Sequence, residues 1–194
     1  RPLAAHCGEL GILFHSTPMS RGAAKKLNEL GVEFWKVGSG DILDFVTLDY
    51  LASTGKPIII SSGMSTLEEL DQMMNFLKRR NAPVILLHCV SKYPCPPEEL
   101  NLSTIGFLRE RYGIPVGFSD HSIGIDSALA GVALGAQVIE KHFSFARDLW
   151  GADHKVSMTP GELKALVAGI RELEANPVKR AEYLEKDIVK AGMG

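Results

Sequence analysis

The stretch Pro57-Ile58-Ile59-Ile60-Ser61-Ser62-Gly63-Met64 decides the fold class of this 194-residue chain. Its three consecutive isoleucines are apolar on both faces, which is typical of a parallel strand covered by helices on both sides. Six short apolar runs recur, with starts 22 to 31 residues apart, at residues 11–15, 33–37, 57–61, 83–89, 114–119 and 137–143. A polar or glycine-containing turn and a helical pattern follow each run, so the chain is predicted to consist of βα units around a parallel sheet.

Polar residues follow every predicted strand, and this favours a (β/α)8 barrel over an open doubly wound sheet, where ligands gather at one switch point. A barrel needs eight units and typically about 250 residues. Since six units are counted, we predict a partial TIM barrel over residues 1–176, with the first two units missing. Residues 177–194 are predicted to be a charged C-terminal tail. Ser65, with Glu68 three residues later, predicts a capping box for the helix between the third and fourth strands.

Composition excludes several classes of protein. The formal net charge is −2 and there is no basic block, so nucleic acid is not an expected partner. No apolar run approaches the roughly 20 residues that cross a bilayer, so no membrane association is expected. Three cysteines are an odd number and too few for a disulfide framework, which favours a reducing compartment and hence the cytoplasm.

A lysine and two short Gly/Ser turns predict an anion site. Lys36 ends the second predicted strand and is followed by Gly38-Ser39-Gly40, whose backbone N–H groups can form an anion nest. Ser61-Ser62-Gly63 adds further donors at the start of a helix. The pattern therefore indicates a phosphorylated substrate, although Lys36 can also act as a Schiff-base nucleophile or be a surface lysine.

Two histidines end neighbouring strands. The side-chain period of a strand is two, so Ser119 shares a face with His121 and Glu140 with His142. In a barrel that face is the interior, where both imidazoles can ligate one divalent cation and leave positions open for substrate. The alternative is that each is an ordinary core or rim histidine.

Three further residues are candidates on chemical grounds. Glu140 is a possible acid or base, or a buried partner that orients a ligand. Asp153 lies on a loop that can cover the mouth of the barrel, or is a solvated carboxylate. Tyr93, before Pro94, can stack on a ligand or hydrogen-bond to it, or belong to the core.

Taken in order, the motifs from Leu13 to Leu173 resemble the sialic acid synthases and their relatives, which make nonulosonic acids such as legionaminic and pseudaminic acid and include spore-coat polysaccharide proteins. The motifs are Phe14-His15-Ser16-Thr17-Pro18, Lys36-Val37-Gly38-Ser39-Gly40-Asp41, Ser61-Ser62-Gly63-Met64, Gly117-Phe118-Ser119-Asp120-His121, Val132-Ala133-Leu134-Gly135-Ala136, Glu140-Lys141-His142-Phe143, and Gly151-Ala152-Asp153 followed by Ser157-Met158. Their shared order and spacing make the resemblance specific.

The resemblance implies a barrel that condenses phosphoenolpyruvate with an N-acylated amino sugar and releases phosphate. It implies phosphoenolpyruvate contacts at Thr17, Lys36, Ser39, Ser61 and Ser119. It makes His121 and His142 the ligands of a divalent cation, usually Mn²⁺, with Mg²⁺ or Co²⁺ as alternatives. Glu140, Tyr93 and Asp153 are implied around the sugar and the developing tetrahedral centre, and Lys36, Glu140 and Asp153 are the expected catalytic residues.

The chain also departs from the family pattern. Ser91 is a substrate-binding candidate at a position where many members have Asn. The family's Glu-containing first strand and Lys-containing second strand are not found, nor is its antifreeze-like C-terminal domain, which reaches into the partner subunit of what is expected to be a homodimer. Two other hypotheses therefore stay open: a Schiff-base aldolase acting through Lys36, and a truncated, non-catalytic sugar-binding barrel.

Overall fold

A computed structural model describes residues 2–175 as alternating helices and strands. The predicted tail lies outside the described residues. No helix within the described range is long and apolar enough to cross a membrane. The elements, in chain order, are α1 (Pro2–Glu9), α2 (Arg21–Glu29), β1 (Trp35–Val37), the 3-10 helix η1 (Ser39–Asp41), α3 (Phe45–Ser53), β2 (Ile58–Ser61), α4 (Leu67–Lys78), β3 (Val84–Cys89), η2 (Pro97–Glu99), α5 (Thr104–Tyr112), β4 (Val116–Asp120), α6 (Asp126–Ala133), β5 (Ile139–Lys141), η3 (Ala152–Val156) and α7 (Pro160–Ala175).

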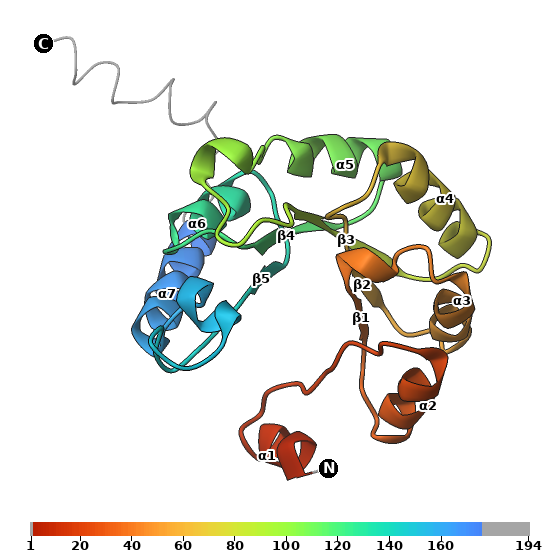
Figure 1. Ribbon diagram of the computed structural model, residues 1–194. Helices are drawn as coiled ribbons and strands as arrows, with labels where there is room; N and C mark the ends of the chain where they lie inside the picture. The colour runs from red at the N-terminus through yellow and green to blue at the C-terminus, as the bar shows by residue number, and fades with distance from the viewer. Residues whose placement is uncertain (1, 176–194) are drawn as a thin grey trace, which may run out of the picture.

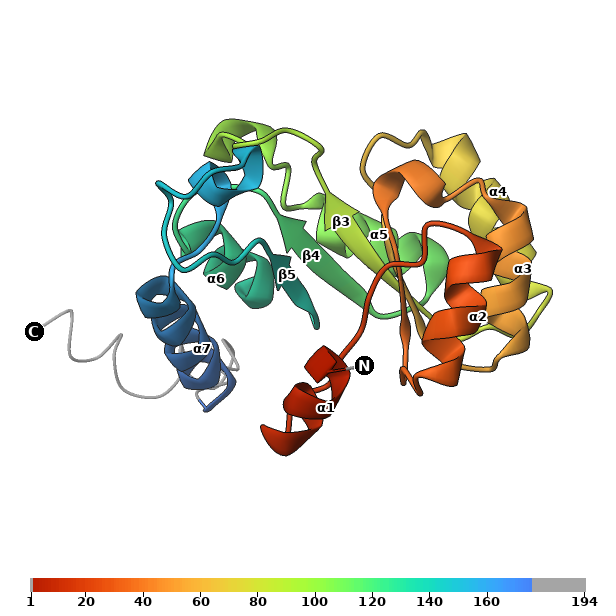
Figure 2. The same cartoon turned by 60° about the horizontal axis from the view of Figure 1, so that its bottom comes forward.

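The five strands form one parallel sheet in the order β1-β2-β3-β4-β5. Parallel neighbours need a crossover, and a helix supplies each one. Figure 1 shows helices α2 to α7 in an arc around the outside of the sheet, while α1 lies apart at the open end of the arc, as the second view also shows (Figure 2). The architecture is therefore half of a parallel α/β barrel.

The sheet is strongly curved, and one side-chain contact shows by how much. Lys36 lies on β1 and Glu140 on β5, at opposite edges of the sheet, yet Lys36 Nζ is 3.4 Å from a carboxylate oxygen of Glu140. In a flat sheet, four strand spacings would separate the two backbones by about 19 Å. The curvature therefore brings the two edges to face each other across the concave side.

The hydrophobic core lies between the convex face of the sheet and the helices. Trp35, Ile58, Ile60, Leu86 and Phe118 alternate with concave-side residues along their strands and are fully buried. The indole N–H of Trp35 donates to Thr54 Oγ1 at 2.8 Å. Packing in this core fixes the position of each strand, and therefore the position of the residues at its carboxyl end.

Two sequence predictions are wrong in detail. Residues 11–15 are coil and not a strand, with Ile12 and Leu13 exposed, because a parallel strand exists only when a neighbour pairs with it and the described structure gives this segment no such ladder. The capping box of α4 uses Thr66 and Glu69, one residue later than predicted. The other five predicted strands are confirmed; each is shorter than predicted, and β4 ends one residue later, at Asp120.

Candidate functional site

The candidate site lies on the concave face, at the carboxyl ends of the strands. Successive side chains of a strand point to opposite faces, and the parallel registers place one chemically active residue of each strand on this side. These residues are Lys36 on β1, Ser61 on β2, Cys89 on β3, Ser119 on β4 and Glu140 on β5. Four of the five are predicted site residues; Cys89 is not.

Lys36 is the centre of the polar network. Its ammonium group donates to Ser61 Oγ at 2.8 Å and to the carbonyl of Val37 at 3.0 Å. It is also the cation facing Glu140 across the sheet. The side chain is only 8% exposed, so these oxygens replace most of its water shell.

Glu140 connects the two sides of the site. One carboxylate oxygen accepts a hydrogen bond from Ser119 Oγ at 2.8 Å, and the other faces Lys36. Ser119 and Glu140 are direct partners in the β4–β5 ladder, so the hydrogen bond runs along one rung. The carboxylate itself is about a third exposed and is therefore open to a ligand on the concave side.

The two histidines lie side by side beyond this rung, with ring centroids 5.5 Å apart. Tyr93 packs on both: its ring is 4.1 Å from that of His121 and meets His142 edge-on at 5.7 Å. Burial raises the pKa of the Tyr93 phenol, helped by nearby acidic groups. The ring therefore forms one wall of the site.

The two imidazoles differ in electrostatic environment. Burial lowers the pKa of His142, an effect that the carboxylate of Asp153 partly opposes. Burial alone would also lower the pKa of His121, but contacts with Cys89 and the Val90 carbonyl outweigh it and raise that pKa. His121 Nδ1 lies 2.8 Å from the Val90 carbonyl oxygen and donates to it, which leaves Nε2 as the lone-pair nitrogen.

This donor set fits a divalent cation held by few protein atoms. A metal-ligating histidine usually donates its other N–H to a carbonyl or a carboxylate, as His121 does. Among residues 2–175, no group of three His, Cys, Asp or Glu side chains is arranged to hold a metal ion. Water or substrate oxygens would therefore have to complete the coordination of a cation at His121 and His142.

A second group of donors surrounds Gly63, directly after β2. A methyl group added there would lie 2.7 Å from Ser39 Oγ, 3.0 Å from Cys89 Sγ and in contact with Ser91 Oγ. Only a residue without a side chain allows these three polar groups to converge on the backbone. Predicted residues Ser39 and Ser91 thus come together with Gly63, from the predicted Gly/Ser turn, and with Cys89, which no sequence pattern indicated.

Cys89 is a site residue that the cysteine count does not indicate, because the count bears only on disulfide formation. Ser39 Oγ donates to its sulfur at 3.7 Å, and His121 lies at 4.0 Å. The period of two along β3, continued from the apolar Leu87, was the available signal. His88, one residue earlier, faces the helices instead and donates to the Leu100 carbonyl at 2.6 Å.

The remaining two predicted residues are less closely attached. Asp153, in η3, is largely exposed, and its carboxylate is 3.8 Å from His142 Nδ1. Thr17 is half-buried in the coil before α2, where the described residues give it no hydrogen bond to the other candidates. The structure therefore brings Asp153 to the rim of the site and does not connect Thr17 to it.

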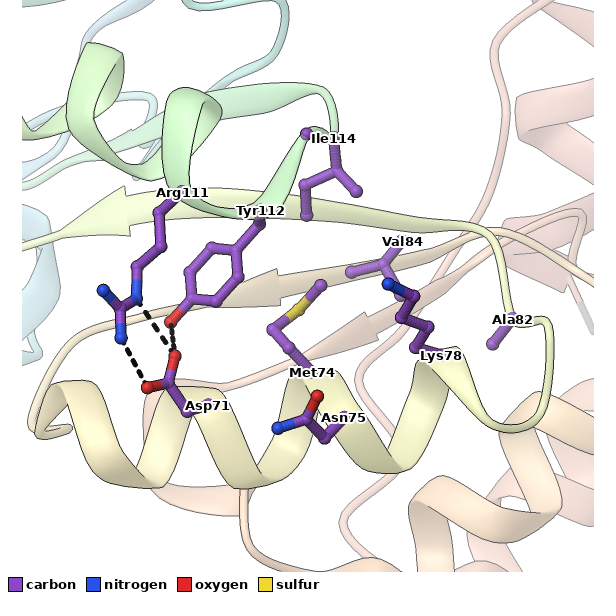
Figure 3. A pocket seen from close by; sticks show the side chains of 10 residues that line it. Asp71, Met74, Asn75, Lys78, Ala82, Val84, Arg111, Tyr112 and Ile114 are labelled. Carbon is purple, nitrogen blue, oxygen red and sulfur yellow. Dashed lines mark hydrogen bonds and ion pairs between the residues drawn. The ribbon is translucent and has the colours of Figure 1, made fainter.

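A separate groove of about 710 Å³ lies on the outer wall, between α4 and α5 (Figure 3). Met74, Val84 and Ile114 form its apolar floor, and the ion pair of Arg111 with Asp71 closes one end. It is on the convex side, behind the sheet, so it belongs to the packing of neighbouring βα units.

Fold and site together define a class: a parallel α/β half-barrel with a lysine, hydroxyl and carboxylate network and two histidines at its strand ends. Within that class the chain belongs to the NeuB family, whose model matches residues 1–180. The resemblance predicted from the motifs is therefore confirmed.

Individual proteins similar to this chain are synthases of nonulosonic acids. The chain is 40% identical to the N,N'-diacetyllegionaminic acid synthase of Campylobacter jejuni, over 96% of this chain and 58% of that one. It is 40% identical to human N-acetylneuraminate-9-phosphate synthase, over 90% of this chain and 49% of the human protein. The crystal structure of a Leptospira borgpetersenii N-acetylneuraminic acid synthetase in complex with citrate superposes with a TM-score of 0.86 at 38% identity, covering 89% of this chain and 60% of that one. The chain spans about half the length of the curated relatives it matches.

Proposed function

We propose that this chain is part of an enzyme that condenses phosphoenolpyruvate with an N-acylated amino sugar in its open aldehyde form. The product is a nonulosonic acid, and inorganic phosphate is released. One observation carries the proposal: Lys36, Ser61, Ser119 and Glu140 form one connected network across the concave face, beside His121 and His142. The names of the relatives, which are synthases of such acids, support it.

The network suits a phosphorylated substrate. A lysine ammonium and two serine hydroxyls supply a positive charge and several donors in a confined space, and Ser39 and Ser91 supply two more beside Gly63. The Lys36 Nζ is already engaged by Ser61, Val37 and Glu140. This favours a charge-bearing donor over the free amine that a Schiff-base aldolase requires.

His121 and His142 would hold the divalent cation, which we propose to be Mn²⁺. When bound, the cation supplies Lewis-acid polarisation of the aldehyde oxygen. The residues of the chain then do the positioning: Tyr93 closes one side of the imidazole pair, and Asp153 lies at the rim where a sugar would enter.

The bond changes balance with water as the only further reactant. The enol carbon of phosphoenolpyruvate attacks the aldehyde carbon, forming the new C–C bond. Water then adds to the resulting cationic carbon, the C–O bond to phosphate breaks, and phosphate leaves with its charge offset by Lys36. Glu140 accepts from Ser119 and faces Lys36, so it is placed to take up or return a proton during these steps.

We further propose that the parent protein is a closed (β/α)8 barrel, a homodimer and cytoplasmic. Residues 11–15 have the apolar pattern of a strand and are separated from β1 by one helix, α2, so they would pair with it when the barrel closes. Two more βα units would then precede them. The exposed leucine and isoleucine side chains of this segment support such a partner.

The test is the release of phosphate from phosphoenolpyruvate with a panel of N-acylhexosamines and Mn²⁺. His121→Ala should reduce release by at least 100-fold, because an imidazole ligand is lost. The matched control is His6→Ala, an exposed histidine on α1, which should keep the full rate. Undiminished release in His121→Ala contradicts the metal role, and borohydride trapping of substrate on Lys36 supports the aldolase instead.

A further inference from the structure

A buried ion pair lies directly behind the two histidines, on the face of the sheet that packs against the helices. Lys141 Nζ donates to Asp120 Oδ2 at 2.7 Å, and the two side chains are 2% and 0% exposed. Within residues 2–175, the two side chains are more deeply buried than those of the other salt bridges described, such as Lys36 with Glu140 at 8% and 37% exposure. Neither residue faces the substrate side, so neither has a role in the reaction proposed above.

The pair occupies the last rung of the β4–β5 ladder. Asp120 and Lys141 are direct partners in the register, one step after the Ser119–Glu140 rung. Each immediately precedes one of the two histidines in the chain. The ion pair therefore joins the two strands at the point where His121 and His142 leave the sheet.

The pair also holds the segment that follows His121. Asp120 Oδ1 accepts a hydrogen bond from the Ser122 backbone N–H at 2.8 Å, and Lys141 Nζ donates to the Ser122 carbonyl at 2.5 Å. Backbone on both sides of His121 is thus tied to one carboxylate and one ammonium group. The Lys141 contact with Ser122 also fixes that turn to the strand that carries His142.

Stability alone is a poor explanation for this pair. Removing two charges from water is costly, and apolar residues of similar volume often fold a protein as well or better. What a buried ion pair provides is a defined geometry, since its hydrogen bonds tolerate little displacement. Such a geometry is needed where two side chains on neighbouring strands must meet at one point.

We propose that Asp120 and Lys141 are positioning residues that set the separation and orientation of His121 and His142 for binding a divalent cation. This inference rests on the proposed function, because it needs the cation. Groups that orient metal ligands from behind typically change metal affinity 10- to 100-fold when they are removed. The expected effect on this protein is of that size.

The test is a Mn²⁺ titration of the purified chain, with the six-line EPR signal of free Mn²⁺ as the readout. Asp120→Asn keeps the shape and removes the charge, and Lys141→Met removes the ammonium group. Each should raise the Kd 10- to 100-fold. The double variant should lose little more than either single variant, because the two residues act as one unit.

Two controls separate positioning from loss of stability. Met73→Ala removes a fully buried side chain of α4, far from the histidines, and should lower Tm while keeping the wild-type Kd. Arg111→Met breaks the α4–α5 ion pair on the outer wall and should also keep it. If Lys141→Met does not fold, the isosteric Asp120→Asn variant decides.

The outcomes are distinct. Wild-type affinity in folded Asp120→Asn or Lys141→Met overturns the positioning role and leaves the proposed function intact. A loss of affinity in Met73→Ala equal to that of the ion-pair variants also overturns it, since stability would then explain both. A wild-type chain that binds no Mn²⁺ overturns the metal part of the proposed function, and the positioning role with it.

Discussion

Gly63→Ala is expected to damage the site while leaving the fold intact. Gly63 does not need a positive φ, so its backbone accepts alanine. The new methyl group would lie 2.7 Å from Ser39 Oγ and 3.0 Å from Cys89 Sγ, against ordinary contact distances of about 3.5–4.0 Å. Ser39 and Ser91 must therefore move by about 1 Å or rotate away.

Displacement of that size sets the expected magnitude. A 1 Å misplacement of a positioning group, or the loss of one preorganised donor, costs about 100-fold in rate. At about 1.36 kcal/mol for each factor of ten, this is about 2.7 kcal/mol of transition-state stabilisation. The displaced atoms are the free ends of hydroxyl and thiol side chains, so the stability loss should stay near the lower end of about 1–3 kcal/mol for overpacking.

The assay is phosphate release as a function of phosphoenolpyruvate concentration, with thermal unfolding measured on the same samples. Gly63→Ala should lower kcat/KM about 100-fold, because it displaces the Ser39 and Ser91 hydroxyl groups. Gly161→Ala is the matched control, because a methyl group there meets nothing within 4 Å. A Gly63→Ala protein with kcat/KM within twofold of wild type would refute the reasoning.

Two further predictions concern stability. Trp35→Phe removes the donor to Thr54 Oγ1 from a fully buried ring and should lower the free energy of unfolding in urea by about 1–3 kcal/mol. The control Trp150→Phe, at a 98% exposed position, should change the free energy of unfolding by less than about 0.5 kcal/mol. Equal effects of the two variants would contradict the burial argument. Burial lowers the pKa of His88 against the opposing hydrogen bond to Leu100, so the unfolded chain takes up a proton first as the pH falls. The contribution of neutral His88 to the free energy of unfolding is fully present above about pH 6.5 and declines as the pH falls below that value. Unfolding midpoints between pH 7.5 and 5 should therefore fall less in His88→Gln than in wild type, and parallel curves would contradict this.

Local patterns predicted much of the fold correctly. Five of the six apolar runs are strands of one parallel sheet, because the strand face that packs against the helices keeps apolar residues at alternate positions. The remaining run, residues 11–15, is also apolar, but it is coil. Apolar pattern reports the tendency of a segment to be buried, whereas strand formation also needs a paired neighbour.

The sequence by itself determined which side chains share a face. The period of two places Ser119 with His121 and Glu140 with His142, and the order of the motifs identifies the family. Each of these is a property of a few consecutive residues or of their spacing along the chain.

Only the tertiary structure decided which of these groups meet. Curvature of the sheet brings Lys36 to Glu140 from the opposite edge, and the ladder register pairs Asp120 with Lys141 behind the histidines. The turn after β2 brings Gly63 among the polar side chains of Ser39 and other segments. The physical reason is that curvature and register arise from packing between elements far apart in the chain, which no local pattern encodes.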